Sequence, residues 1–273
     1  RIQALLEEVD EVTKSERAGE PRKLKGAIRF EQVSFAYEKD RPVLHEISFS
    51  IAPGEKVALV GHTGSGKTSI ISLLQGFYRP TQGSVLLDGI PLNQINIQDL
   101  RSQIGVVPQD VLLFHDTLRA NVAYGRPQAS DAAILKVLEA AQIGGLVQRL
   151  PQGLDTRIGG DEGLTPSAGE AQRLAMARAI LIEPAIVILD EASSSLDSKE
   201  EARLQAAILS LLQGHSAIII AHRLSTIRQC DRIIVLEAGR ILEQGSPEQL
   251  LTDPNSSYSR LHRSHFSSVQ ADV

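Results

Sequence analysis

The stretch KVALVGHTGSGKTSIISLLQ, residues 56–75, decides the fold. It joins a continuous apolar run at 56–60 to a run with helical spacing at 68–75, through a turn that holds three glycines. A short continuous apolar run suits a strand that is buried on both faces of a parallel sheet. The stretch therefore predicts a β-strand, a glycine-rich loop and an α-helix in that order, which is a unit of an α/β fold.

Similar apolar runs recur along the chain, with helical stretches between them. The runs are IGVV at 104–107, AIVIL at 185–189, AIIIA at 217–221 and RIIVL at 232–236. The helical stretches include DAAILKVLEAAQ, GEAQRLAMARAILI and KEEARLQAAILSLLQ. Nearer the amino end, IRFEQVSFAY and LHEISFSI alternate apolar with polar residues, as half-buried antiparallel strands do. This order predicts an α/β fold with a mostly parallel sheet and an antiparallel β subdomain on its N-terminal side.

The composition changes along the chain and suggests where it divides. Residues 110–182 hold few strand-like runs and several helical ones, so we expect an α-helical subdomain inserted there. Residues 1–25 begin with apolar residues at helical spacing and continue with a charged stretch, and residues 256–273 are mostly polar. We therefore expect one domain over 26–255, preceded by a helix and linker and followed by a tail.

Charge and cysteine content exclude several classes of protein. The formal net charge is −5, which gives no overall attraction to nucleic acid, and we expect no nucleic-acid partner. The lone Cys230 excludes an internal disulfide framework and a cysteine-based zinc cluster. No stretch approaches the roughly eighteen consecutive apolar residues that a membrane-spanning helix needs. The composition, 42% apolar and 22% charged, is that of an ordinary globular domain.

The glycine-rich turn fits the pattern G-x-x-x-x-G-K-[ST]. In such a loop backbone N–H groups surround phosphates, the helix start adds its positive end, Lys67 reaches the β and γ oxygens, and Thr68 ligates Mg²⁺. The sequence therefore predicts a nucleoside triphosphate site; the alternative is a glycine turn that enters a helix without binding anything. The residues expected to contact the nucleotide are Gly61, Thr63, Gly64, Ser65, Gly66, Lys67, Thr68 and Ser69.

Two carboxylates follow a second buried run, in IVILDEASSSLD at 186–197. Asp190 ends the predicted strand, where it can orient a water in the magnesium shell. Glu191 comes next, at a position suited to polarising an attacking water as a general base. A lone glutamate would be read as a surface residue, but its place beside this strand favours a catalytic one.

With these two motifs in register, the chain resembles the nucleotide-binding domain of ABC transporters, of the exporter type, over about 26–255. The resemblance implies a P-loop NTPase core, ATP hydrolysis, and ATP and Mg²⁺ as cofactors. It implies that Tyr37, in FAY, stacks on adenine, and that Gln109, in VVPQD, contacts the magnesium and senses the transmembrane partner. It also implies that His222, in AHRLST, contacts the γ-phosphate, and that Asp197 lies in the loop that crosses between subunits. Catalysis would rest on Glu191, His222 and Lys67.

The segment TRIGGDEG at 156–163 resembles the loop that exporters place against their membrane domains, with Asp161 where a glutamate is usual. This favours export over import. Residues 1–25 resemble the cytoplasmic extension of a last membrane helix, so we expect a six-helix membrane domain to precede Arg1 in the full gene product. The domain would then lie on the cytoplasmic face of a membrane.

The second diagnostic motif of the family is altered. The family signature reads L-S-G-G-Q, and alignment on QRLAMARA places Pro166, Ser167, Ala168, Gly169 and Glu170 there, so that three of five positions depart. In the family this motif grips the γ-phosphate held by the P-loop of a second domain packed head to tail. Ala168 adds a methyl group where the backbone approaches phosphate, and Glu170 replaces a neutral amide by a carboxylate. Ser167 and Glu170 also fit a capping box, which predicts that the helix itself starts well.

An intact P-loop half and an altered signature half favour a heterodimer with a partner that carries an intact signature. A homodimer with two weak sites is the alternative within the family. Three rivals lie elsewhere: a soluble ABC-type ATPase that works on DNA or ribosomes, a non-hydrolysing ATP-gated interaction module, and the separate ATPase subunit of an importer. The sequence names neither the transported substrate nor the partner.

Overall fold

The computed structural model describes residues 23–159, 164–190, 198–221 and 223–266 of the chain. Several sequence predictions fall outside these ranges. They concern Glu191, Asp197, His222 and Asp161. Residues 1–22 of the predicted N-terminal helix and linker, and residues 267–273 of the predicted tail, also lie outside the described ranges. The division into domains that the sequence suggests stays a prediction.

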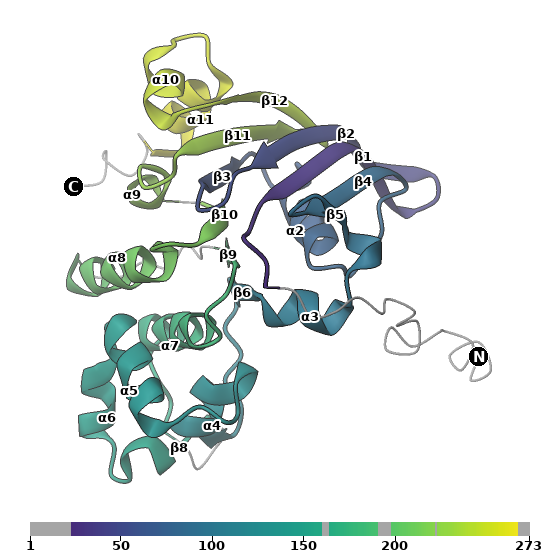
Figure 1. Cartoon of the computed structure of the whole chain (residues 1–273). Helices are drawn as coiled ribbons and strands as arrows, with labels where there is room; N and C mark the ends of the chain where they lie inside the picture. Colours follow the sequence, from purple (N-terminus) through teal and green to yellow (C-terminus); the bar gives the residue numbers. More distant parts are fainter. Residues whose placement is uncertain (1–22, 160–163, 191–197, 222, 267–273) are drawn as a thin grey trace.

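A six-stranded sheet with the order β12-β11-β3-β10-β9-β6 forms the centre of the fold (Figure 1). Its strands are β3 (Lys56–Val60), β6 (Ile104–Val107), β9 (Ile186–Asp190), β10 (Ser216–Ile220), β11 (Arg232–Glu237) and β12 (Arg240–Gly245). All neighbouring strands pair in parallel except β11 and β12, which form an antiparallel hairpin. The predicted α/β class with a mostly parallel sheet is therefore confirmed.

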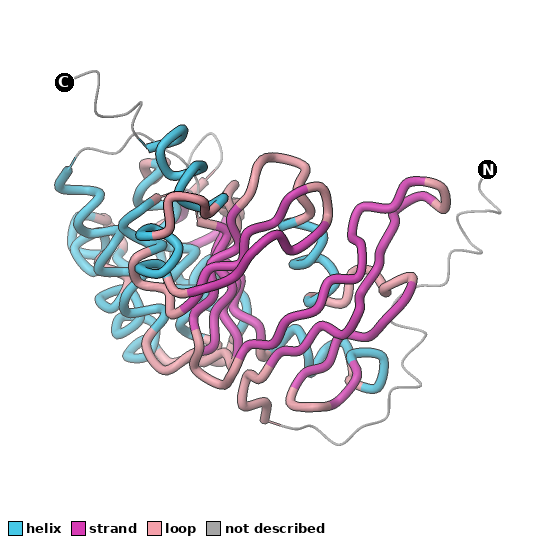
Figure 2. The backbone as a smooth tube through the Cα atoms, turned by 90° about the horizontal axis from the view of Figure 1, so that it is seen from above, coloured by secondary structure: helices cyan, strands magenta, loops and turns pink. Residues whose placement is uncertain are grey.

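A second, antiparallel sheet lies on the N-terminal side, as the alternating pattern predicts. It has the order β2-β1-β4-β5, with β1 (Ile28–Glu38), β2 (Arg41–Ile51), β4 (Gln82–Leu87) and β5 (Ile90–Pro91). A two-stranded ribbon joins β7 (Asp116–Thr117) to β8 (Arg157–Ile158). Figure 2 shows the antiparallel sheet on one side of the six-stranded sheet and most of the helices on the other.

Helices fill the rest of the described chain. They are α2 (Lys67–Leu74), α3 (Ile97–Ser102), α4 (Leu118–Val122), α5 (Asp131–Ala140), α6 (Gly144–Arg149), α7 (Ala168–Leu181), α8 (Ser198–Leu212), α9 (Leu224–Ile227), α10 (Pro247–Thr252) and α11 (Ser257–Phe266). Three short 3-10 turns also lie in the described ranges: η1 (Leu92–Gln94) between β5 and α3, η2 (Ala123–Gly125) between α4 and α5, and η3 (Gly153–Asp155) between α6 and β8. None of the helices in the described ranges combines the length and apolar composition that crossing a membrane requires.

The central strands are buried on both faces, which explains their continuous apolar runs. In β9, Ile186 and Ile188 join one buried cluster while Val187 and Leu189 join another. The first cluster also contains side chains from β1, β2 and α2, and the second contains side chains from α4 to α8. Alternation along each strand therefore supplies both cores at once, and α2 and α7 pack on opposite faces of the sheet.

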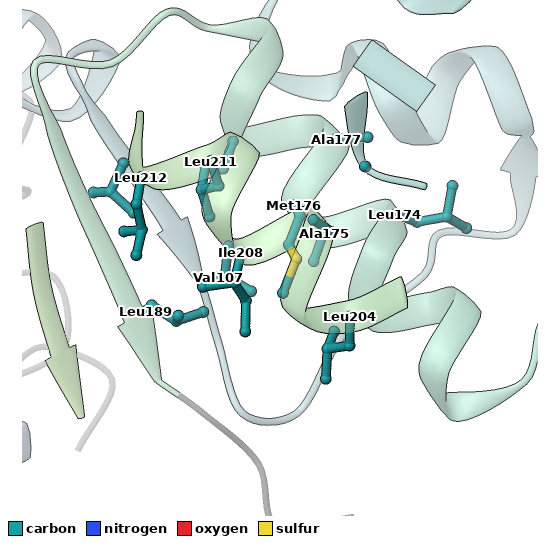
Figure 3. Close-up of a cluster of buried hydrophobic side chains, with 14 of the residues drawn as sticks. Val107, Leu174, Ala175, Met176, Ala177, Leu189, Leu204, Ile208, Leu211 and Leu212 are labelled. Carbon is teal, nitrogen blue, oxygen red and sulfur yellow. The ribbon is translucent and has the colours of Figure 1, made fainter. Parts of the chain in front are cut away.

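The core between α7, α8 and the sheet is drawn in Figure 3. Met176 of α7 and Ile208 of α8 meet Val107 of β6 and Leu189 of β9 in one cluster, and all four are fully buried. These contacts fix α7 to the sheet, and so fix the position of the segment at its start.

We expect Ile208→Ala to lower the free energy of unfolding by about 2–5 kcal/mol, because it leaves a cavity in a close-packed core. Chemical denaturation of the 273-residue chain measures this change. The neighbouring Leu209 is 48% exposed, so Leu209→Ala should cost less than about 1 kcal/mol. Equal losses for the two variants would contradict the assignment of the buried face of α8.

Candidate functional site

The loop between β3 and α2 together with the first residues of α2, residues 61–69, is called the P-loop from here on. Gly66 is the N-cap of α2 and has φ 105°, a left-handed conformation that glycine adopts readily. The ammonium group of Lys67 turns back across the loop and donates to the carbonyl oxygens of Gly61 at 2.7 Å and His62 at 2.9 Å. The P-loop is thus closed around its own lysine.

Lys67 is a buried cation, only 8% exposed. Burial lowers the pKa of its ammonium group, and the negative charge of Asp190 partly opposes this shift. The two residues that the sequence places in separate motifs therefore interact electrostatically. A buried ammonium group next to a helix N-terminus strongly attracts a multiply charged anion.

The other residues of the P-loop divide into buried and exposed ones. Ser65 and Ser69 are buried, whereas Thr63, Gly64 and Thr68 are exposed. Gly64 has φ 82° and open space where a Cβ would lie. The exposed residues line the side of the P-loop that a ligand can reach, and the buried ones hold the loop against the domain.

The parallel sheet gathers the predicted site residues at one edge. The P-loop follows β3, Asp190 ends β9, and Gln109 lies two residues after β6, all at the carboxyl ends of parallel strands. Strand β10 lies between β3 and β9, and its carboxyl end, Ile220, lies at the same edge. Gln109 is exposed and follows the outermost strand, on the side of β9 away from β3.

Tyr37 lies beside the P-loop but comes from the antiparallel sheet. Its hydroxyl group is 3.1 Å from Ser69 Oγ, and its ring packs edge to face on Phe35 and Tyr78. The ring is nevertheless 48% exposed. An aromatic ring that is fixed by its neighbours and still open to solvent can stack on a planar group such as a nucleotide base.

Sequence reasoning missed Gly239, which supports the P-loop from the β11–β12 hairpin. Its N–H donates to the Ser65 carbonyl oxygen at 3.1 Å, and its own carbonyl accepts from His45 N at 2.9 Å. A Cβ at Gly239 would overlap the Val43 carbonyl oxygen, and its φ is 74°. The only sequence signal, a glycine between two apolar runs, indicates a hairpin turn and not a contact with the P-loop.

The segment that aligns with the family signature lies at the start of α7. Ser167 caps the helix and forms the predicted capping box with Glu170. Pro166 and Gly169 are buried, whereas Ser167 and Ala168 are exposed. This segment lies across the sheet from α2, because α7 and α2 belong to different buried clusters (Figure 1). One chain therefore does not bring its own Ser167 to its own P-loop.

Glu170 is held on both carboxylate oxygens. One oxygen accepts from the backbone N–H of Ser167 at 3.0 Å, and the other pairs with Arg149 of α6. Burial opposes ionisation of this carboxyl group, but the hydrogen bonds from Ser167 and Arg149 outweigh it and lower its pKa. Sequence reasoning missed Arg149, because a helical spacing does not say which residues of another helix it meets.

Comparison with known proteins identifies the relatives of this chain. A family model described as ABC transporter matches residues 44–194. An ATP-dependent lipid A-core flippase of Burkholderia orbicola (strain AU 1054) is 48% identical over 261 residues, which are 94% of this chain and 43% of that protein. One of Legionella pneumophila (strain Paris) is 46% identical over 252 residues, 92% of this chain and 42% of that protein.

A solved structure that is similar to this chain is also an ABC transporter. It is described as a bacterial Atm1-family ABC exporter with ATP bound, and it matches with a TM-score of 0.80 and 40% identity over 91% of this chain and 42% of that one. The chain thus spans less than half the length of the proteins it matches.

We expect Gly239→Ala to disturb the P-loop. The new Cβ meets the Val43 carbonyl oxygen, and the left-handed backbone adds about 1–2 kcal/mol of strain. Gly214 has φ 80° with nothing within 4 Å of its Cβ position, so Gly214→Ala carries the strain without the overlap. Thermal unfolding should show a clearly larger loss for Gly239→Ala. Equal losses would contradict a supporting role for this contact.

Proposed function

The chain belongs to the ABC transporter family, in which it forms an ATPase domain of the exporter type, and we propose that it drives export across a membrane by pairing head to tail with a second such domain. The observation that carries this proposal is the P-loop: a buried Lys67 that interacts with Asp190 at the carboxyl edge of a parallel sheet. That geometry suits the binding of a triphosphate.

ATP would lie over the P-loop with its adenine on Tyr37. The exposed ring of Tyr37, fixed next to Ser69, supports this placement. Backbone N–H groups of the P-loop would bind the phosphates, and Lys67 would exchange its two carbonyl partners for phosphate oxygens. Because phosphate oxygens carry negative charge and the two carbonyl oxygens are neutral, this exchange favours the ligand.

Thr68, Asp190 and Gln109 would hold Mg²⁺ together with the nucleotide. Their hydroxyl, carboxylate and amide oxygens are donors that a hard cation accepts. Phosphate oxygens and water would complete the coordination. The cation would supply charge stabilisation at the phosphoryl oxygens.

Hydrolysis would need three residues at the same edge. Glu191, next to Asp190, would orient and deprotonate the attacking water, and His222 would contact the γ-phosphate; both lie outside the described residues. Lys67 would stabilise the negative charge on the oxygens of the transferred γ-phosphoryl group and of the ADP that leaves. A non-hydrolysing ATP-gated module is the second candidate, and turnover distinguishes the two.

The second domain follows from the position of α7. Since α7 and α2 pack on opposite faces of the sheet, the signature segment that covers the nucleotide would come from another chain. Pro166, Ala168 and Glu170 favour a non-identical partner, as the sequence indicates. A second copy of this chain is the alternative, and Asp197 would cross between the domains in either case.

We propose further that a membrane domain is joined to the N-terminal side, which would place this domain on the cytoplasmic face of a membrane. The relatives are named as flippases of lipid A-core, and their names favour a lipid-linked cargo. The segment 156–163 would then face the membrane domain; Asp161 itself lies outside the described residues.

Lys67→Met keeps the volume of the side chain and removes its charge. We expect Mg-ATP affinity to fall on the order of a hundredfold, since charge-assisted hydrogen bonds to phosphate are lost. Lys56 begins β3, at the end of that strand away from the P-loop, so Lys56→Met is the matched control and should bind Mg-ATP normally. Calorimetric titration measures both affinities, and equal affinities would contradict the site.

Glu191→Gln should abolish most ATP turnover and preserve ATP binding, because the amide cannot act as the base. Phosphate release and nucleotide affinity are measured on the same preparation. If the wild-type chain binds ATP but does not hydrolyse it, whether it is tested alone or with a partner that carries an intact signature, the non-hydrolysing module would be supported instead. Near-normal turnover in the variant would remove Glu191 from its role.

A further inference from the structure

Arg149 forms an ion pair with Glu170, the residue that stands where the family signature has glutamine. We propose that Arg149 is a positioning residue for this motif: it neutralises Glu170 so that the start of α7 can close on the triphosphate of a second copy of this chain. The inference rests on the head-to-tail pairing of the proposed function. It takes the alternative partner named there, a second copy of this chain, because the pair with Arg149 balances the charge that sets Glu170 apart from the family's glutamine.

The geometry fixes the carboxylate at the first turn of α7. Glu170 is the third residue of the helix, where a glutamate side chain turns back toward the N-cap. Its side chain is 16% exposed, against 67% for Arg149, so the carboxylate is held under the arginine. Neither oxygen of Glu170 lacks a donor, since Ser167 N and Arg149 occupy one each.

The electrostatic need for Arg149 follows from the position of Glu170. The N-terminus of a 14-residue helix carries a partial positive charge that favours anions. A carboxylate in the first turn cancels that attraction and would repel a triphosphate. The hydrogen bonds to Glu170 lower its pKa, so the group is ionised at neutral pH and its charge is balanced by a cation and not by a proton.

The side chains that line the surrounding cleft show which arginine pairs with Glu170. The cleft has a volume of about 820 Å³, and its lining includes three arginines and three glutamates: Arg149, Arg173, Arg203, Glu139, Glu170 and Glu200. Arg173 and Arg203 both pair with Glu200, at 2.7 and 2.6 Å. Their charges are therefore engaged elsewhere, and Arg149 is the arginine that pairs with Glu170.

Arginine and glutamate together thus reproduce the net charge of the neutral glutamine. Glutamine at the third helix position also serves in a capping box, so Glu170→Gln preserves the start of the helix. The double variant Arg149→Gln/Glu170→Gln is then neutral like the native pair. Arg149→Gln alone leaves the carboxylate of Glu170 without its cation, so this variant should bind the triphosphate of a second copy less well.

The experiment measures the monomer–dimer constant of the 273-residue chain with Mg-ATP by analytical ultracentrifugation, with Glu191→Gln in every variant to block turnover. We expect ATP-dependent self-association that Arg149→Gln weakens on the order of tenfold at low salt, and less at high salt. The double variant should restore it, and Arg149→Lys should restore it in part, because lysine keeps the charge but not the planar geometry.

Arg126 supplies the matched control. It binds the opposite end of α7, through the Leu181 carbonyl oxygen and Glu183, so Arg126→Gln makes the same charge change far from the signature. Arg126→Gln should leave self-association unchanged. If Arg149→Gln does not fold, Glu170→Gln alone decides, because it should associate at least as tightly as the native pair.

Two results would overturn the inference. One is a chain that binds ATP but stays monomeric, which would leave the heterodimer of the proposed function in place. The other is equal weakness of Arg149→Gln and the double variant, since a merely structural arginine would not be rescued by removing Glu170. Failure of the proposed function has a different signature: nucleotide binding that Lys67→Met does not change.

Discussion

The burial of one ammonium group, that of Lys67, is the constraint on which the rest of the structure depends. A lysine cannot be buried without partners, and the P-loop supplies them by turning the carbonyl groups of Gly61 and His62 inward. That turn requires a left-handed Gly66 and leaves no room for a side chain at Gly61, where a Cβ would overlap the Leu236 carbonyl oxygen. Sheet, hairpin and helix are all arranged around this loop.

The same sheet is the structural basis for the proposed pairing with a second domain. Its two faces carry two cores, with α2 in one and α7 in the other. In the proposed function the phosphate-binding edge and the signature segment of one chain would therefore belong to two different sites, and each complete site would combine two chains. In this account ATP is the link between them, and the charge at the start of α7 sets how well the link closes.

Periodicity predicted the elements whose structure depends on local pattern. The runs that became β3, β9, β10 and β11 are buried on both faces, and a strand of that kind has a continuous apolar sequence. The P-loop was predictable because glycine, lysine and threonine at fixed spacing have one physical use. The edge strand β12, half-exposed along its length, has no such run and was not predicted.

The contacts that sequence reasoning could not supply join distant segments. Gly239 touches Ser65 and Val43, and Arg149 meets Glu170, through packing that no local pattern encodes. The altered signature shows the consequence. In the sequence, Glu170 is a negative charge where the family has a neutral glutamine. In the folded chain, each oxygen of its carboxylate has a partner, Ser167 N–H or Arg149.

The most direct test of the central claim is hydrogen exchange of the backbone amides of residues 61–69, with and without Mg-ATP. If these N–H groups bind the phosphates, ATP should slow their exchange strongly at a concentration where the chain is monomeric, while the amides at the start of α7 should slow only when two chains associate. Exchange at 61–69 that saturating Mg-ATP leaves unchanged would contradict the account.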